Sequence, residues 1–223
     1  MNNLTLIIPA KNEKESLPHV LEELKGKNIK VHVILEEIDQ KTIKSISNFE
    51  CKIIFQKKIG YGDALIEGIN SVNTKYFCIF NADGSFDPAE IDTMLKKINE
   101  YDFDFIFGSR YEKNSGSDDD TIVTRIGNFF FTLIGNIFFG LNITDILYTF
   151  VLGKTEQAKK LELKQKDFTF CTELPLKANQ RKMKLGTINC YERKRIAGKK
   201  KVNAFRDGYL ILVYMIKFFV NKI

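Results

Sequence analysis

The sequence predicts an α/β fold in which a mainly parallel sheet is flanked by helices. Short runs of β-forming residues alternate with helical patterns through the first half of the chain, and such alternation is typical of βαβ units. The chain has 223 residues, of which 44% are hydrophobic, and these values suit one compact domain with an ordinary core. Disorder is therefore not expected, and functional side chains are expected in loops at the carboxyl ends of the strands.

Strands and helices are expected in strict alternation in this first half. Runs rich in β-branched and aromatic residues predict strands, and apolar residues at helical spacing predict the helix after each strand. The fourth helix is expected to open at Pro88, and if the residues before it form a plain turn, Asp87 would be its N-cap. The expected strands cover residues 4–8, 30–35, 51–56, 76–80 and 103–107, and the expected helices cover residues 16–25, 40–46, 62–71 and 88–99.

A polar loop and a long apolar segment follow these elements. Residues 108–120 are rich in Ser, Gly and Asp, and we expect this loop to be mobile. Residues 126–144 contain no charged side chain. Their length would allow a membrane span, but glycines and asparagines dilute the apolar character. We expect a helix that either packs in the core or lies in a membrane interface.

The C-terminal segment is also apolar. Residues 209–220 contain one charge, Lys217, and are too few to cross a bilayer as a helix. Together with Lys217 and Lys222, this segment either lies on an anionic membrane surface or docks on the domain. We therefore expect one domain over residues 1–208 and a C-terminal helix over residues 209–223.

The charge distribution indicates an anionic partner. The net charge is +6, and basic residues are concentrated in residues 181–201. Such a run suits nucleic acid, a membrane surface or a phosphorylated substrate. Nucleic acid is not expected, because the run contains a single aromatic residue, Tyr191, and no motif that would enter a groove.

The cysteines and the N-terminus predict a cytosolic protein. The four cysteines have no CxxC spacing, and three lie in apolar or strand-like stretches, so we expect reduced core residues. Met1 runs directly into an expected strand without the regions of a signal peptide, and export is not expected. The cysteines are Cys51, Cys78, Cys171 and Cys190.

A candidate metal site follows the fourth expected strand, at Asn81-Ala82-Asp83. A carboxylate at a strand end, with an oxygen-bearing side chain two residues earlier, suits a hard divalent cation bound against a diphosphate. The same residues also suit a plain turn into the next helix. An aspartyl-phosphatase motif would require a nucleophilic aspartate where Asn81 stands, so that chemistry is not expected.

The order of motifs resembles the family 2 glycosyltransferases. The motif Pro-Ala-Lys-Asn-Glu follows the first strand, an acidic pair follows the second, Gly-Tyr-Gly-Asp-Ala opens the helix after the third, and Asn-Ala-Asp follows the fourth. Later motifs are similar to the polyprenyl-phosphate sugar transferases, the branch that resembles dolichol-phosphate-mannose synthase. The early motifs are residues 9–13, 36–37, 60–64 and 81–83, and the later ones are residues 108–111, 192–195 and 198–202.

The resemblance implies a GT-A type, Rossmann-like fold that takes a sugar from a nucleoside diphosphate sugar with help from Mg²⁺ or Mn²⁺. It places Asp83 at the metal. The residues implied at the donor are Pro9, Ala10, Asn12, Glu13, Glu37, Asp39, Gly62, Asp63, Asn81, Ala82 and Asp83. The residues implied at the acceptor are Arg110, Arg125, Arg193, Arg195 and Lys201, and those implied in catalysis are Asp83, Arg110 and Asp145.

The chain departs from the family pattern at three places. Asn81 replaces the first acid of the usual Asp-x-Asp, which predicts a weakened metal site. Residues 36–39 lengthen the acids after the second strand and lack the usual glycine, so recognition of the base or ribose is expected to differ. Residues 147–151 keep only Phe150 of the usual stretch after Asp145, which leaves the acceptor open.

Three functions fit these observations. The first is transfer of a hexose or related sugar to a polyprenyl phosphate or other membrane-linked acceptor, by a cytoplasmic protein that is peripheral at the inner membrane face and serves cell envelope polysaccharide. A phosphate acceptor is already an anion and needs no general base. The second is a soluble glycosyltransferase that acts on a glycan hydroxyl, with Asp145 as the base. The third is an inactive homologue that binds nucleotide sugars.

Overall fold

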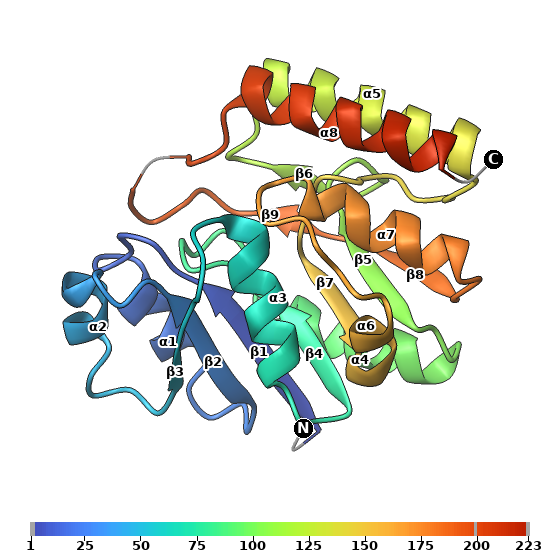
Figure 1. The fold of residues 1–223 in the computed structure, drawn as a ribbon. Helices are drawn as coiled ribbons and strands as arrows, with labels where there is room; N and C mark the ends of the chain where they lie inside the picture. The colour runs from blue at the N-terminus through green and yellow to red at the C-terminus, as the bar shows by residue number, and fades with distance from the viewer. Residues whose placement is uncertain (1–2, 199, 222–223) are drawn as a thin grey trace.

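The computed structural model describes residues 3–198 and 200–221 and shows a sheet between helices (Figure 1). Seven strands form the main sheet in the order β3-β2-β1-β4-β7-β5-β8, and only β7 runs antiparallel to its neighbours. The expected α/β class with a mainly parallel sheet is confirmed. The strands are β1 (Leu4–Pro9), β2 (Lys30–Leu35), β3 (Lys52–Phe55), β4 (Tyr76–Ile79), β5 (Phe105–Ser109), β6 (Gly116–Ser117), β7 (Val151–Lys154), β8 (Leu185–Asn189) and β9 (Tyr191–Glu192).

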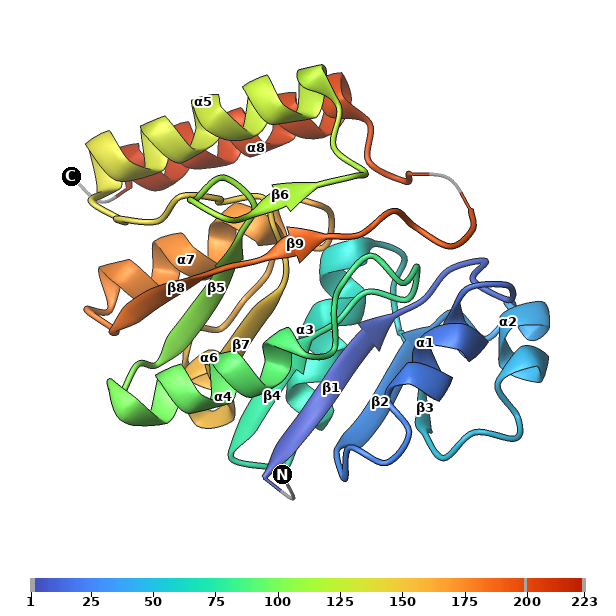
Figure 2. The same cartoon turned by 180° about the vertical axis from the view of Figure 1, so that it is seen from behind.

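Helices cover both faces of the sheet, and two long helices lie beyond the carboxyl ends of its strands. They are α1 (Leu17–Glu23), α2 (Gln40–Ser45), α3 (Tyr61–Ser71), α4 (Glu90–Glu100), α5 (Ile122–Phe139), α6 (Thr155–Lys160), α7 (Phe170–Gln180) and α8 (Ala204–Val220). One hydrophobic core packs α1 and α4 on the sheet, and a second packs α3 and α7 on its other face. Figures 1 and 2 show α5 and α8 side by side beyond the carboxyl end of β1. The four cysteines are free, as expected.

The order of the strands reverses beside β1. The chain extends from β1 through β2 to β3 on one side, and it returns to place β4 on the other side of β1. In open parallel sheets a crevice forms at such a reversal, outside the carboxyl ends of the strands. The loops after β1 and β4 therefore border the natural place for a ligand.

The start of α4 differs from the expectation. Asp87 Oδ1 accepts a hydrogen bond from the Ala89 backbone N–H at 2.8 Å, and the helix begins at Glu90 with Ala89 as its N-cap. Asp87 and Pro88 thus form a turn before the helix; the predicted start at Pro88 is two residues early, and the alternative in which Asp87 caps the helix is wrong. The Asp87 carboxylate satisfies a backbone donor ahead of the helix instead of one in its first turn.

The long apolar segment forms α5, which begins and ends earlier than residues 126–144. Thr121 caps the helix through a capping box with Thr124, and Gly140 ends it with a φ of +67°. The apolar run continues beyond Gly140 as non-helical chain. Among the described residues, α5 is the one helix that is long and apolar enough to cross a membrane by length and composition.

The C-terminal helix α8 begins at Ala204 instead of residue 209. Asn203 caps it by accepting a hydrogen bond from the Arg206 N–H at 3.0 Å. Ile211 and Met215 are buried in the same core as residues of α5, so the inner side of α8 is docked on the domain. Lys222 and the end of the expected 209–223 segment lie outside the described residues.

The expected mobile loop contains a short strand. Residues 116–117 form β6, which pairs in parallel with β9, and Asp118 N–H donates to the Glu192 carbonyl at 2.9 Å. Strands of two residues have no periodic pattern, so the sequence could not reveal them. This pairing carries residues 118–120 toward the carboxyl ends of the strands of the main sheet.

Candidate active site

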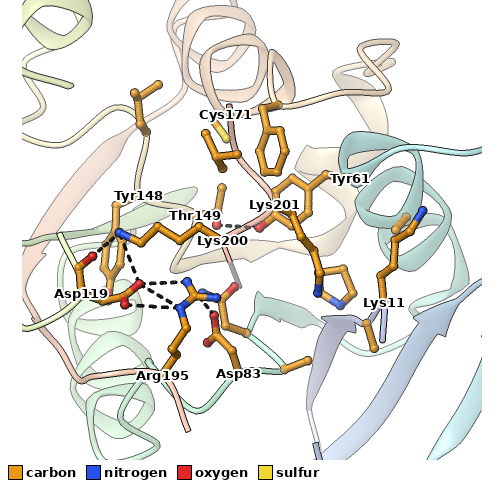
Figure 3. A pocket seen from close by; sticks show the side chains of 18 of the residues that line it. Lys11, Tyr61, Asp83, Asp119, Tyr148, Thr149, Cys171, Arg195, Lys200 and Lys201 are labelled. Atoms are coloured by element: carbon orange, nitrogen blue, oxygen red, sulfur yellow. Dashed lines mark hydrogen bonds and ion pairs between the residues drawn. The ribbon is translucent and has the colours of Figure 1, made fainter. Parts of the chain in front are cut away.

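One cavity of about 570 Å³ lies where the loops after β1 and β4 meet α5 and the chain after β9 (Figure 3). We distinguish two of its sides. The sheet wall consists of Pro9, Ala10, Glu13, Asn81, Ala82 and Asp83. The helix wall consists of Arg110, Thr124, Asn128, Leu147 and Tyr148. Residues 193–198 and 200–203, which we name the basic strap, contribute Arg195, Lys200, Lys201 and Val202 to the lining, and the chain around Tyr61, Phe168 and Cys171 borders it as well.

Glu13 is held in place at the sheet wall. Its side chain is almost fully buried, and its carboxylate accepts a hydrogen bond from Ser16 Oγ at 2.6 Å. The Glu13 backbone N–H donates to Thr42 Oγ1 at 3.0 Å, which ties the loop after β1 to α2. Lys201 of the basic strap forms an ion pair with the same carboxylate. A residue predicted at the donor therefore contacts one predicted at the acceptor.

A second hollow adjoins the cavity and shares Lys11 and Glu36 with it. Asn12 and Asp39 line this hollow, and Asp39 Oδ2 accepts the Asn12 N–H at 2.7 Å. The left-handed backbone of Asn12, with a φ of +56°, turns the chain into this contact. Glu37, which we also predicted at the donor, lines neither hollow.

Gly62 and Asp63 shape the cavity without lining it. A Cβ atom at Gly62 would lie 2.2 Å from the Gln165 carbonyl oxygen. Only glycine therefore lets α3 pack this closely against the backbone of residues 165–167. Asp63 Oδ2 accepts the Lys58 N–H at 3.0 Å and so closes the loop after β3. Their neighbours Gly60 and Tyr61 line the cavity instead.

The Asn-Ala-Asp loop presents one carboxylate to the cavity. Asn81 Nδ2 donates to Ser85 Oγ at 3.2 Å, and Asp83 Oδ1 accepts the Ser85 N–H at 3.1 Å. Asp83 Oδ2 lies 3.4 Å from Arg195 Nη2. Within residues 3–198 and 200–221, no group of three acidic, His or Cys side chains could hold a metal ion. A divalent cation bound with a diphosphate would therefore have Asp83 as its one carboxylate from this loop.

The basic strap lies across this loop. Backbone hydrogen bonds join Arg193 N–H to the Ser85 carbonyl and Ile196 N–H to the Asp83 carbonyl, both at 2.8 Å. Figure 3 shows Arg195 between Asp83 and Asp119. Arg195 Nη2 lies 2.8 Å from Asp119 Oδ2, and Lys200 Nζ approaches the same oxygen to 3.4 Å. These cations and carboxylates neutralise one another beside the site expected for a diphosphate.

A buried ion-pair network supports the helix wall. Both oxygens of Asp145 accept hydrogen bonds from the Arg110 guanidinium, at 2.7 and 3.0 Å, and Arg110 Nη1 lies 3.1 Å from Glu192 Oε2. Burial disfavours the charge on Arg110, but the two carboxylates outweigh this effect and raise the pKa of its guanidinium well above the ordinary value. Asp145 has a fully buried side chain and does not line the cavity.

The predicted acceptor residues do not all reach the cavity. Arg110, Arg195 and Lys201 line it. Arg125 is exposed on α5 and lies over the Tyr111 ring, with 5.7 Å between its Cζ and the ring centroid. Arg193 donates to Glu23 at 2.8 Å and to the Phe86 carbonyl at 2.7 Å, behind the cavity lining.

Several cavity residues escaped the sequence analysis, among them Asp119, Lys200 and Asn128. Asp119 belongs to an acidic run that looked like a solvated loop, and Lys200 was one of several lysines in the basic run. Asn128 was counted only as a residue that dilutes an apolar segment. A better indication was available for Asn128, because it recurs at helical spacing with Thr132 and Asn136, and an inward polar stripe on an apolar helix needs partners.

The fold is shared with solved sugar-phosphoglycerate synthases. Glucosyl-3-phosphoglycerate synthase from Mycobacterium tuberculosis, solved with Mn²⁺, UDP and glucosyl-3-phosphoglycerate, matches 97% of this chain and 79% of its own, with a TM-score of 0.76 and 10% identity. Mannosyl-3-phosphoglycerate synthase from Rubrobacter xylanophilus matches 99% and 74%, with a TM-score of 0.72 and 12% identity. These similarities establish a GT-A glycosyltransferase fold.

The sequence itself shows the family. Residues 5–161 match the model of glycosyl transferase family 2, and the chain belongs to this family of glycosyltransferases. It is 26% identical over 196 residues to an uncharacterised protein of Methanocaldococcus jannaschii. The aligned region covers 84% of this chain and 80% of that protein. It is also 24% identical over 97 residues, 44% of each chain, to an uncharacterised glycosyltransferase of Mycobacterium tuberculosis.

Proposed function

We propose that this glycosyltransferase moves a hexose or related sugar from a nucleoside diphosphate sugar to a polyprenyl phosphate or other membrane-linked acceptor. The observation that carries the proposal is the position of α5 and α8. Thr124 and Asn128 of α5 and Arg206 of α8 line the cavity, while the outer sides of both helices are apolar and exposed. A membrane-held acceptor would then enter the cavity beside the helices that contact the membrane.

The outer sides of the two helices have the composition of a membrane-binding surface. Phe129 is 68% exposed and Ile137 is 66% exposed, whereas soluble monomers rarely expose large contiguous apolar patches. The exposed cations Arg125, Arg206 and Lys217 lie on the same helices and would attract anionic headgroups. We name this surface the apolar face; it consists of Ile122, Val123, Ile126, Phe129, Phe130, Leu133, Ile137 and Phe138 of α5 with Phe205, Tyr209, Ile216 and Val220 of α8.

The inner side of α5 favours a helix that lies in the interface over one that crosses the bilayer. Thr132 Oγ1 accepts the Ile146 N–H at 3.2 Å, and Asn136 bonds both polar groups of Ile143. These bonds attach α5 along its length to the chain that leads to β7. We therefore infer a cytoplasmic protein, peripheral at the inner membrane face, in the synthesis of cell envelope polysaccharide.

The sheet wall would bind the donor. Pro9, Ala10 and Glu13 would contact the nucleotide, and Asp83 would face its diphosphate. Mg²⁺ or Mn²⁺, which would be held by Asp83 and the diphosphate, supplies positive charge to the leaving group. Because Asn81 offers no second negative charge, we infer a weaker metal site than an Asp-x-Asp would make.

The buried Asp145 and the cations of the basic strap favour a phosphate acceptor over a glycan hydroxyl. A hydroxyl would need a base, and the buried Asp145 has both oxygens bound to Arg110. A phosphate needs cations instead, and Arg195 and Lys201 lie in the cavity. We therefore assign Asp145 the task of positioning Arg110.

A small phosphorylated acceptor is the second candidate. It is favoured by the fold, because glucosyl-3-phosphoglycerate synthase was also solved with phosphoglyceric acid. Transfer to a glycan hydroxyl and an inactive nucleotide-sugar-binding protein are the remaining alternatives.

Sedimentation with vesicles and an acceptor panel test the proposal together. The protein should sediment with phosphatidylglycerol vesicles and not with phosphatidylcholine vesicles, and it should glycosylate farnesyl phosphate in preference to 3-phosphoglycerate or methyl glucoside. The double variant Phe129→Glu/Ile137→Glu should stay in the supernatant while UDP still stabilises it in a thermal-shift assay. Tyr101→Glu, an exposed aromatic residue at the end of α4, is the matched control. Indifference to anionic vesicles, or transfer to 3-phosphoglycerate alone, would contradict the proposal.

A further inference from the structure

A row of three polar side chains runs along the buried side of α5. Asn128, Thr132 and Asn136 recur every four residues, so they share one side of the helix. Each accepts a hydrogen bond from a backbone N–H in the chain before β7: Leu147 N–H to Asn128 Oδ1 at 2.9 Å, Ile146 N–H to Thr132 Oγ1 and Ile143 N–H to Asn136 Oδ1, both at 3.2 Å. The row therefore fixes residues 143–147 against the helix.

Asn128 differs from Asn136 in its donor group. Asn136 Nδ2 donates to the Ile143 carbonyl at 2.8 Å, so both ends of this amide are paired. Asn128 Nδ2 is buried and has no hydrogen-bond partner in the described part of the chain. The orientation of the Asn128 amide is determined, because only its oxygen can accept the Leu147 N–H. The unpaired group is therefore the amide donor.

The cavity explains the unpaired donor. Asn128 is 1% exposed and belongs to the helix wall, whereas Thr132 and Asn136 do not line the cavity. Buried amide groups in native proteins nearly always have a partner, and an unpaired one indicates a missing water or ligand. The member of the row that reaches the cavity is the member with a free N–H.

We propose that Asn128 Nδ2 donates a hydrogen bond to an oxygen of the acceptor substrate and so positions the acceptor in the cavity. The inference rests on the proposed function, since it takes the helix wall as the acceptor side. The oxygen belongs to a phosphate or a hydroxyl, both of which accept from an amide. Asn128 is then a positioning residue whose loss affects acceptor binding and leaves donor binding unchanged.

Two substitutions at Asn128 separate the role of its Nδ2 donor group from that of the hydrogen bond that its Oδ1 accepts from Leu147. Asn128→Asp keeps an oxygen for the Leu147 N–H and removes the amide donor, whereas Asn128→Leu removes both. Thr132→Val is the matched control, because it removes a bond of the same kind one turn along α5 and leaves the cavity lining intact. Steady-state kinetics are measured with the acceptor that the wild type uses from farnesyl phosphate, 3-phosphoglycerate and methyl glucoside.

The acceptor KM should rise about tenfold or more in both Asn128 variants, as expected for the loss of one hydrogen bond in a desolvated site. The donor KM and the thermal shift with UDP should stay at wild-type values. Thr132→Val should lower Tm without changing the acceptor KM. The acceptor that the wild type uses tests the proposed function. The acceptor KM of the Asn128 variants tests the role of Asn128, whichever acceptor that is.

The Asn128 side-chain amide resonances, assigned by their loss in Asn128→Asp, should shift when the acceptor is added and not when UDP is added. An unchanged acceptor KM in both Asn128 variants would overturn the proposal and indicate a buried water as the partner of Nδ2. An equal rise in KM for Thr132→Val would overturn it too, because the effect would then come from the loosened helix.

Discussion

The sheet wall and the helix wall border the same cavity but are built over different distances along the chain. The sheet wall comes from two short segments, within residues 9–13 and 81–83, each at the carboxyl end of a strand of the parallel sheet. The helix wall joins Arg110, Asn128 and Tyr148, which come from the loop after β5, from α5 and from the chain before β7. One wall is local in sequence, and the other exists only after folding.

This difference shows which part of the site a short sequence motif can predict. A strand of a parallel sheet fixes the position of the loop that follows it, so the residues of that loop lie at the same place in the fold wherever the motif occurs. The helix wall depends on Arg110 and its partners Asp145 and Glu192, which are distant in sequence. We therefore expect loss of the buried Arg110 network behind the helix wall to affect the fold, and loss of a side chain from the sheet wall to affect the ligand.

The largest effect on stability is expected from Arg110→Met. The substitution leaves the Asp145 carboxylate, whose side chain is fully buried, without its partner. Loss of one member of a buried pair costs about 3–5 kcal/mol in the free energy of unfolding. Urea denaturation would measure it. Lys25→Met is the control, since the Lys25–Glu22 pair is more than half exposed and should change stability by less than about 1 kcal/mol. Equal losses in the two variants would contradict a buried network.

A smaller effect, confined to the ligand, is expected from Asp83→Ala. The side chain pairs with Arg195 and accepts one local backbone N–H, from Ser85, so the fold should keep most of its Tm, while turnover should fall about a hundredfold or more because charge compensation at the diphosphate is lost. Transfer assays and thermal shifts with UDP and Mn²⁺ would measure both. Asp87→Ala, in the same loop but outside the cavity lining, should retain donor binding. A large loss of Tm in Asp83→Ala would erase the distinction between the walls.

The smallest effect is expected from Asn81→Asp. A second carboxylate beside Asp83 adds negative charge to the metal site, and the Mn²⁺ concentration for half-maximal binding of the nucleoside diphosphate that the wild type accepts should fall about tenfold. Isothermal titration of that nucleotide, chosen from UDP, GDP, CDP and dTDP, at several Mn²⁺ concentrations would show the change. Asn12→Asp, which adds the same charge in the neighbouring hollow, should leave the Mn²⁺ dependence unaltered. A dependence unchanged by Asn81→Asp would mean that Asn81 does not approach the metal.

Local patterns were reliable where a single segment determines its own structure. The strands and helices of the first half lie close to their predicted positions, and the residues of the sheet wall were named from motifs. The patterns misplaced the ends of two helices. Asp87 accepts the Ala89 N–H ahead of α4, so this helix begins later than predicted. Helix α5 ends at Gly140, beyond which the chain returns so that Ile143 bonds to Asn136.

The sequence by itself determined the α/β class, the family and the loops that form the sheet wall, because alternation and short motifs act within one or two turns of chain. Only the tertiary structure decided that the basic strap lies across Asp83, that Asp145 is bound to Arg110, and that Asn128 reaches the cavity. The physical reason is that ion pairs and buried amides form between segments far apart in sequence, and no periodicity along the chain records which of them meet.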